Sequence, residues 1–158
     1  MSDFKFLSKY VFDSPKQIDH KLVKHTLIKL EKSDIASIEL DIEIPHELNE
    51  FWNHIGYGFF HNNSEYSFDR LLDPNSFKII NLRQEYYEFD PDLEYYEIFP
   101  ERVLFMEIVE GTYLTMDKKN LDGKNSIYYF DELIADSLEE FLKRFDSDGH
   151  YFEKKNNN

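Results

Sequence analysis

Apolar residues recur at three- and four-residue spacing in three segments of the chain, which predicts amphipathic helices there. The first covers residues 14–32, where Ser14 can cap the helix and Pro15 suits its first turn. The second covers residues 45–56 and the third residues 134–148. A glycine stands at or just after the end of the second and third segments, which is a common stop signal for a helix.

Other segments favour extended structure. Residues 38–44 alternate between apolar and acidic side chains, which predicts a short strand or, as an open alternative, an irregular connector. Phe59 and Phe60 are expected to enter a strand after a glycine turn. Residues 102–110, 112–116 and 126–130 predict three strands joined by glycine-containing turns.

Two short segments are less distinctive. Residues 71–75 end in Asp-Pro-Asn, which is typical of a loop. Residues 77–82 are apolar, and the pattern does not separate a strand from a helix there.

The order of these elements predicts an α+β fold. Consecutive strands joined by tight turns pair in antiparallel fashion, and the helices lie apart from them in the sequence. We therefore expect a single domain over residues 1–148, with a central, mostly antiparallel sheet flanked by helices. Residues 149–158 end in three asparagines and are expected to form a disordered tail.

Charge narrows the choice of partners. The chain has 158 residues, and 18 Lys and Arg against 32 Asp and Glu leave a net charge of −14. This field repels the phosphates of nucleic acids and anionic membrane surfaces, and it attracts basic proteins. We expect neither nucleic acid nor membrane as a partner, although solubility alone is an alternative reason for such acidity.

Sequence motifs for catalysis or for metal binding are not found. The chain has no cysteine, no nucleophile elbow and no glycine-rich phosphate loop, and its six histidines lack a metal-ligand spacing. We expect no catalytic residue, no metal ligand and no cofactor. The N-terminal residues carry charge rather than the apolar run of a signal peptide, so a cytoplasmic location is expected.

The most distinctive segment is residues 85–101, which hold seven carboxylates, six aromatic rings and no basic residue. Carboxylates beside exposed tyrosine rings would mimic the phosphates and bases that a nuclease groove accepts. The alternative is a solvated acidic face with its rings turned inward. The candidate partner-binding residues are Glu85, Tyr86, Tyr87, Glu88, Asp90, Asp92, Glu94, Tyr95, Tyr96 and Glu97.

A family resemblance appears when several segments are taken in order. Residues 44–60, with the run IPHELNEFW followed by IGYGFF, resemble the helix-then-strand signature of the SUKH superfamily. Residues 71–74, 105–115 and 127–142 are similar to its following loop, central hairpin and last strand and helix. The residues that match this signature, and that we interpret as structural, are Pro45, Trp52, Gly56, Gly58 and Gly111.

The resemblance implies a function as well as an α+β fold. Bacterial members of the superfamily are largely immunity proteins that bind and neutralise a cognate toxin, often a nuclease, and none of these roles is catalytic. We therefore expect a non-catalytic immunity protein whose partner is a protein toxin, with a basic nuclease domain favoured by the charge. The alternative, implied by fungal relatives, is a regulatory or scaffold module without a toxin partner. The oligomeric state stays open.

Overall fold

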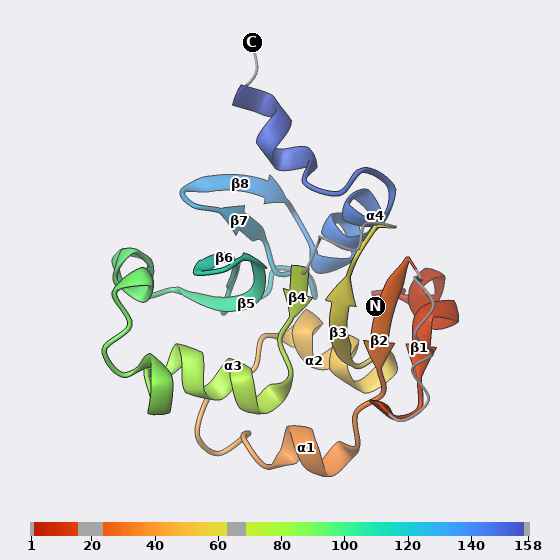
Figure 1. Ribbon diagram of the computed structural model, residues 1–158, viewed down its shortest axis with the longest axis horizontal. Helices are drawn as coiled ribbons and strands as arrows, with labels where there is room; N and C mark the ends of the chain where they lie inside the picture. The colour runs from red at the N-terminus through yellow and green to blue at the C-terminus, as the bar shows by residue number, and fades with distance from the viewer. Residues whose placement is uncertain (1, 16–23, 63–68, 157–158) are drawn as a thin grey trace.

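An eight-stranded sheet organises the described part of the chain, residues 2–15, 24–62 and 69–156 of the computed structural model (Figure 1). The strands cross the sheet in chain order. The first two are parallel, and every later neighbouring pair is antiparallel. The strands are β1 (Val11–Phe12), β2 (His25–Ile28), β3 (Tyr57–Phe60), β4 (Asp69–Leu71), β5 (Arg102–Val109), β6 (Thr112–Asp117), β7 (Ile127–Tyr129) and β8 (Glu132–Ala135).

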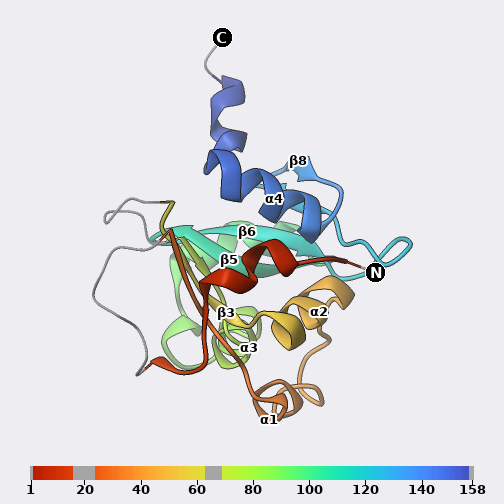
Figure 2. The ribbon, with the colours of Figure 1, turned by 90° about the vertical axis from the view of Figure 1, so that its right-hand side faces the viewer.

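Helices cover both faces of the sheet. The α-helices are α1 (Lys32–Ala36), α2 (His46–His54), α3 (Pro74–Asn81) and α4 (Leu138–Asp148), and the 3-10 helices are η1 (Lys5–Tyr10), η3 (Glu85–Tyr87), η4 (Pro91–Ile98) and η5 (Tyr151–Asn156). In Figure 2, α4 lies on one side of β5 and β6, and α1, α2 and α3 lie on the other. Residues 103–106 and 113–116 are all buried, as expected for strands covered on both faces.

The expected fold class is confirmed. The chain is a single α+β domain around one hydrophobic core, and its sheet is mostly antiparallel. The predicted strands at 102–110, 112–116 and 126–130 correspond to β5, β6 and β7. In the part of the chain that the structure describes, no helix combines the length and apolarity needed to cross a bilayer.

The predicted helix at 45–56 forms as α2, with Pro45 buried at its N-cap. Trp52 lies on its apolar face, and its indole Nε1 donates a hydrogen bond to the carbonyl of Leu72 at 2.9 Å. The indole also packs edge-on against Phe77 of α3, with ring centroids 5.4 Å apart. Trp52 therefore joins α2 to α3 within the core.

Two glycines let β3 lie directly against β2. Gly56 and Gly58 have φ angles of +131° and +145°, which side chains rarely allow. A Cβ at Gly56 would lie 1.9 Å from the carbonyl oxygen of Ile28, and one at Gly58 would lie 2.2 Å from that of Thr26. Both positions therefore require glycine. Gly111, with a φ of +82°, forms the turn between β5 and β6.

The predicted helix at 14–32 is wrong for its last part. Residues 25–28 form β2, and residues 29–31 lie outside any helix, whereas residues 16–23 lie outside the described residues. All four residues of β2 are buried between β1 and β3. Only two of its four residues, Leu27 and Ile28, are apolar, so the strand is too short to show a period of two, and Leu27 also fits helical spacing.

Residues 38–44 are the irregular connector, not a strand. They follow α1, which the sequence pattern did not predict, and they form turns before α2 begins. Ile38 is buried, whereas Leu40 is fully exposed, so the alternating apolar residues do not share one face. The acidic residues between them are exposed: Glu39, Asp41 and Glu43.

The two less distinctive segments form a strand end and a helix. Leu71 ends β4, so the expected loop at 71–75 is shorter than predicted. Asp73 caps α3 by accepting a hydrogen bond from the backbone N–H of Ser76 at 3.3 Å. Residues 77–81 are therefore helical, with Pro74 in the first turn.

The C-terminal elements also differ from expectation. Residues 132–135 form β8, and α4 starts only after Ser137, whose hydroxyl accepts a hydrogen bond from the N–H of Glu140. Residues 149–158 were expected to be disordered, but Tyr151 and Phe152 are buried within η5. These two large rings pack on the core and hold the start of the segment in place, whereas residues 157 and 158 lie outside the described residues.

A buried carboxylate joins four distant segments. Glu47, at the start of α2, accepts backbone hydrogen bonds from Asn125 at 2.6 Å, Leu138 at 2.9 Å and Glu139 at 3.3 Å. It also accepts one from the hydroxyl of Ser2 at 2.8 Å. Two of these donors are the free N–H groups at the N-terminus of α4, where a negative charge is favoured. Glu47 therefore places α4 and the loop before β7 relative to α2.

We predict that Glu47→Ala lowers the free energy of unfolding by at least about 3 kcal/mol, because several buried N–H groups lose their acceptor. Urea unfolding followed by circular dichroism measures this change. Glu43→Ala is the matched control, because Glu43 is exposed in the connector before α2 and should change stability by no more than about 0.5 kcal/mol. Equal losses in both variants would contradict the role of Glu47.

A histidine holds the C-terminal segment against β4. The Nε2 atom of His150 lies 2.8 Å from a carboxylate oxygen of buried Asp69, and Nδ1 lies 3.2 Å from Glu153. The hydrogen bond to Asp69 raises the pKa of His150 above its usual 6.5. The folded chain therefore binds this proton more tightly than the unfolded chain does. The resulting stabilisation is complete below about pH 6.5 and is lost as the pH rises through the folded-state pKa.

We predict that His150→Gln lowers the free energy of unfolding by roughly 1–2 kcal/mol at about pH 6, because a charged hydrogen bond is lost. The loss should be smaller at about pH 8.5, because the stabilisation that comes from the bound proton declines as the pH rises above the ordinary pKa of histidine. Urea unfolding of both proteins at the two pH values tests this. A loss that is the same at both values would show that the charge of His150 does not contribute.

Candidate protein-binding surface

The acidic aromatic segment forms two short 3-10 helices, η3 and η4, between α3 and β5. It lies at the left side of the molecule in Figure 1. We call residues 85–98 the acidic ridge. The sequence shows only that this segment is acidic and aromatic. The structure shows which of its side chains face solvent and which face the core.

Arg83 holds the ridge to the end of α3. Its guanidinium donates to the carbonyl of Ile80 and, at 3.3 Å, to that of Leu93. Its Nε also lies 4.0 Å from a carboxylate oxygen of Glu97. At the start of η4, Asp90 accepts a hydrogen bond from the N–H of Asp92 at 3.0 Å. These contacts fix both ends of η4.

The three-residue period of η4 sorts its side chains. In a 3-10 helix, residues three apart lie above one another. Leu93 and Tyr96 therefore both face the core and are buried, whereas Tyr95 and Ile98 both face solvent. The exposed carboxylates of η4 lie on the solvent side as well: Asp92, Glu94 and Glu97.

Tyr96 is not part of the exposed surface. Only 5 % of it is accessible, and its hydroxyl accepts a hydrogen bond from the N–H of Tyr113 in β6 at 2.8 Å. Burial raises the pKa of Tyr96 above its usual value of 10. Tyr87 is half-buried and packs against the core. The expectation that Tyr96 contacts a partner is therefore corrected, because its ring and hydroxyl are used within the fold.

Most of the other predicted positions are exposed. Tyr86 is 90 % accessible, a large value for an aromatic side chain. The carboxylates of Glu85, Glu88, Glu94 and Glu97 face solvent, and Asp90 is half-buried.

The candidate list taken from the sequence omitted three apolar residues that belong to the same surface. Phe89 is 87 % accessible and Ile98 is also exposed, so both extend the ridge. Phe130 comes from the turn between β7 and β8, and its ring centroid lies 5.5 Å from that of Tyr95. Phe89 could have been found from its place among the rings of the segment. Phe130 could not, because only the tertiary fold brings it to η4.

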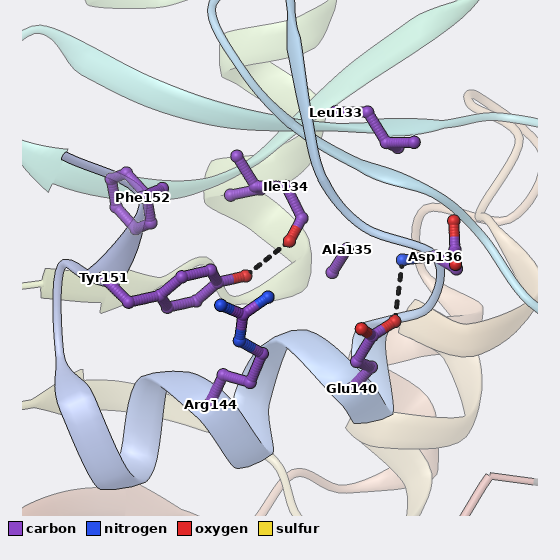
Figure 3. Close-up of a pocket in the computed structure, with 8 residues that line it drawn as sticks. All are labelled: Leu133, Ile134, Ala135, Asp136, Glu140, Arg144, Tyr151 and Phe152. Atoms are coloured by element: carbon purple, nitrogen blue, oxygen red, sulfur yellow. Dashed lines mark hydrogen bonds between the residues drawn. The ribbon is translucent and has the colours of Figure 1, made fainter. Parts of the chain in front are cut away.

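A hollow lies between β8 and α4, and Figure 3 shows the residues that line it. Its volume is about 240 Å³. The hydroxyl of Tyr151 donates to the carbonyl of Ile134 at 2.7 Å, and the guanidinium of Arg144 stacks on the Tyr151 ring at 3.9 Å. The carboxylate of Glu140 accepts from the N–H of Asp136 at 2.9 Å. These polar groups are therefore engaged in contacts within the chain.

No metal centre is found in the part of the chain that the structure describes, since no three His, Asp or Glu side chains there gather closely enough to hold an ion. The acidic ridge spreads its carboxylates over a surface instead. Rings and carboxylates in this arrangement can contact a protein surface.

Comparison with known proteins gives two matches. The family model described as SUKH_6: SMI1-KNR4 cell-wall matches residues 32–142. The chain is 37 % identical over 124 residues to a protein of Bacillus subtilis (strain 168) named Immunity protein YxxD. The aligned region covers 77 % of this chain and 83 % of that protein. No solved structure matches the chain.

We predict that two tyrosines of the acidic ridge differ sharply in their effect on stability. Tyr96→Ala should lower the free energy of unfolding by about 3 kcal/mol or more, because it empties a buried site and leaves the N–H of Tyr113 without its partner. Tyr86→Ala should change it by no more than about 0.5 kcal/mol. Thermal or urea unfolding measures both, and a large loss in Tyr86→Ala would show that this ring supports the fold.

Proposed function

Because the chain belongs to the SMI1-KNR4 cell-wall (SUKH) family, we propose that it is a non-catalytic immunity protein that binds and neutralises a cognate protein toxin. The relative in Bacillus subtilis is itself named an immunity protein. The observation that supports this proposal and locates the binding surface is the acidic ridge, which exposes aromatic rings among carboxylates.

The exposed rings suit a protein contact. Tyr86 and Phe89 lie three residues apart, and both are almost fully accessible. Such rings expose apolar area to water in the free protein. They contribute most to the free energy of binding when they fill a pocket on a partner. Tyr95 and Ile98 extend the apolar area along η4. We propose that these four side chains form the centre of the interface.

The carboxylates around these rings favour a basic partner. The ridge lies within a segment of seven carboxylates and no basic residue, and the whole chain carries a net charge of −14. Complementary charge raises the rate of encounter and disfavours acidic partners. A nuclease domain has a basic groove for phosphates. We therefore propose a nuclease as the toxin and occlusion of its groove as the means of neutralisation, in the cytoplasm.

The first test is expression of the protein encoded by the neighbouring gene, alone and together with this chain. Toxicity alone, relief of toxicity on co-expression, and recovery of a stable complex would support immunity. A partner without toxicity would instead favour the regulatory or scaffold role known in the wider family. Nuclease activity of the isolated partner would test the nature of the toxin separately.

We predict that charge reversal on the ridge weakens toxin binding. Glu88→Lys with Glu94→Lys should lower the affinity about 10–100-fold, mainly through slower association, and should reduce its dependence on salt. Both side chains are exposed, so the stability should change little. Surface plasmon resonance at two salt concentrations measures the rates.

The matched control is Glu39→Lys with Glu43→Lys, which makes the same change of charge on the connector before α2. An equal loss of affinity in the control would show that net charge, and not the ridge, determines binding. Full affinity in the ridge variant would place the interface elsewhere on the protein.

A further inference from the structure

The turn between β7 and β8 adds a second part to the exposed aromatic surface. Phe130 in this turn is 39 % accessible and Tyr95 in η4 is 40 % accessible. Their rings meet edge-on, with an interplanar angle of 82°. Tyr95 also contacts Phe99, at a centroid distance of 5.8 Å. Rings from two separate segments thus form one exposed cluster, which we call the η4–turn patch: Tyr95, Ile98 and Phe130.

The backbone at Phe130 is in an unfavourable conformation. Its φ is +54°, a left-handed value that residues with a large side chain rarely adopt and that glycine adopts readily. The turn has only two residues between the strands, Phe130 and Asp131. A glycine would suit this turn better, and a polar residue would suit its exposure better. The presence of phenylalanine therefore favours a role beyond the stability of the turn.

An arginine of the chain already binds beside this patch. The guanidinium of Arg102 lies 4.0 Å from the ring centroid of Phe99 and 3.5 Å from that of Tyr128. Its Nη1 donates to the carbonyl of Phe130 at 3.1 Å, which ties the turn to the end of η4. Phe99, which contacts Tyr95 of the patch, thus already stacks with a guanidinium, as arginine does on aromatic faces elsewhere.

The two segments that form the patch are acidic. Residues 84–101 and 126–142, which supply both parts of the patch, contain no lysine or arginine. The exposed carboxylates adjacent to the patch in the chain are Glu94, Glu97 and Asp131. Arg102, the basic residue beside it, is largely buried and occupied by its own contacts. A cationic side chain from outside would meet aromatic faces within a negative rim.

We propose that the η4–turn patch is a docking site for an arginine side chain of a basic protein partner. The inference rests on the proposed function, in which that partner is the toxin, and it adds the contact that determines specificity. A guanidinium is preferred over a lysine ammonium because it is planar, stacks on rings and gives up its hydration more easily. Phe130 is then a binding residue, and Arg102 positions it.

The substitution Phe130→Gly separates binding from folding. It removes the ring and relieves the left-handed backbone at the same time, so the unfolding midpoint should change little. Leu121→Ala is the matched control, because it removes an exposed apolar side chain from another hairpin turn, between β6 and β7. Both proteins should keep the circular dichroism spectrum of the wild type.

The first experiment uses peptides and does not require the toxin. The wild-type protein is titrated with an oligo-arginine and an oligo-lysine peptide of equal length, with binding followed by NMR shifts of backbone amides. We expect tighter binding of oligo-arginine, shifts that include Tyr95 and Phe130, and at least about a tenfold loss of affinity in Phe130→Gly but not in Leu121→Ala. Equal binding of both peptides, or unchanged binding in Phe130→Gly, would overturn the proposal.

The second experiment measures protection against the toxin. A folded Phe130→Gly protein that no longer protects cells, beside a protective Leu121→Ala protein, would support the docking site. Full protection by Phe130→Gly would overturn the docking site and leave immunity intact. Failure of the wild type to protect would overturn the proposed function alone, because the peptide titration would still decide whether the patch binds arginine.

Discussion

The hydrogen bonds of the buried Glu47 carboxylate are the constraint on which the rest of the structure depends. The carboxylate joins the start of α2 to the start of α4, to the loop before β7 and to Ser2. The N–H groups at the start of α4 need an acceptor, and the position of α4 follows from where Glu47 supplies it. Because α4 packs against β8, the hairpin of β7 and β8 also takes its place from this contact.

The aromatic residues of the chain serve two opposite purposes. Those of α2, α4 and β5 fill one core, whereas the acidic ridge places some rings inside and others in water. The short three-residue period of η4 makes this division possible within eight residues. Tyr96 supports β6 from within while Tyr95 next to it remains available to a partner. Core and surface are thus built from the same segment.

Sequence patterns predicted the parts of the fold that have a regular period and clear boundaries. The α2 helix and the strands β5, β6 and β7 follow from such patterns. By contrast, β2, β4 and β8 are too short to show a period of two, and Leu27 of β2 also fits the helical spacing that was predicted there. The composition of the sequence was enough to single out the acidic ridge. The burial of Tyr96 and the contact of Phe130 with Tyr95 could not be predicted, because both arise from tertiary packing.

The three-residue period of η4 also has an evolutionary consequence. Only every third side chain, Leu93 and then Tyr96, faces the core, so the positions between them can change without loss of core packing. Substitutions at those positions can alter shape and charge without disturbing the sheet beneath. Sequence changes in this one segment can therefore alter the exposed surface while the sheet and its core are inherited unchanged.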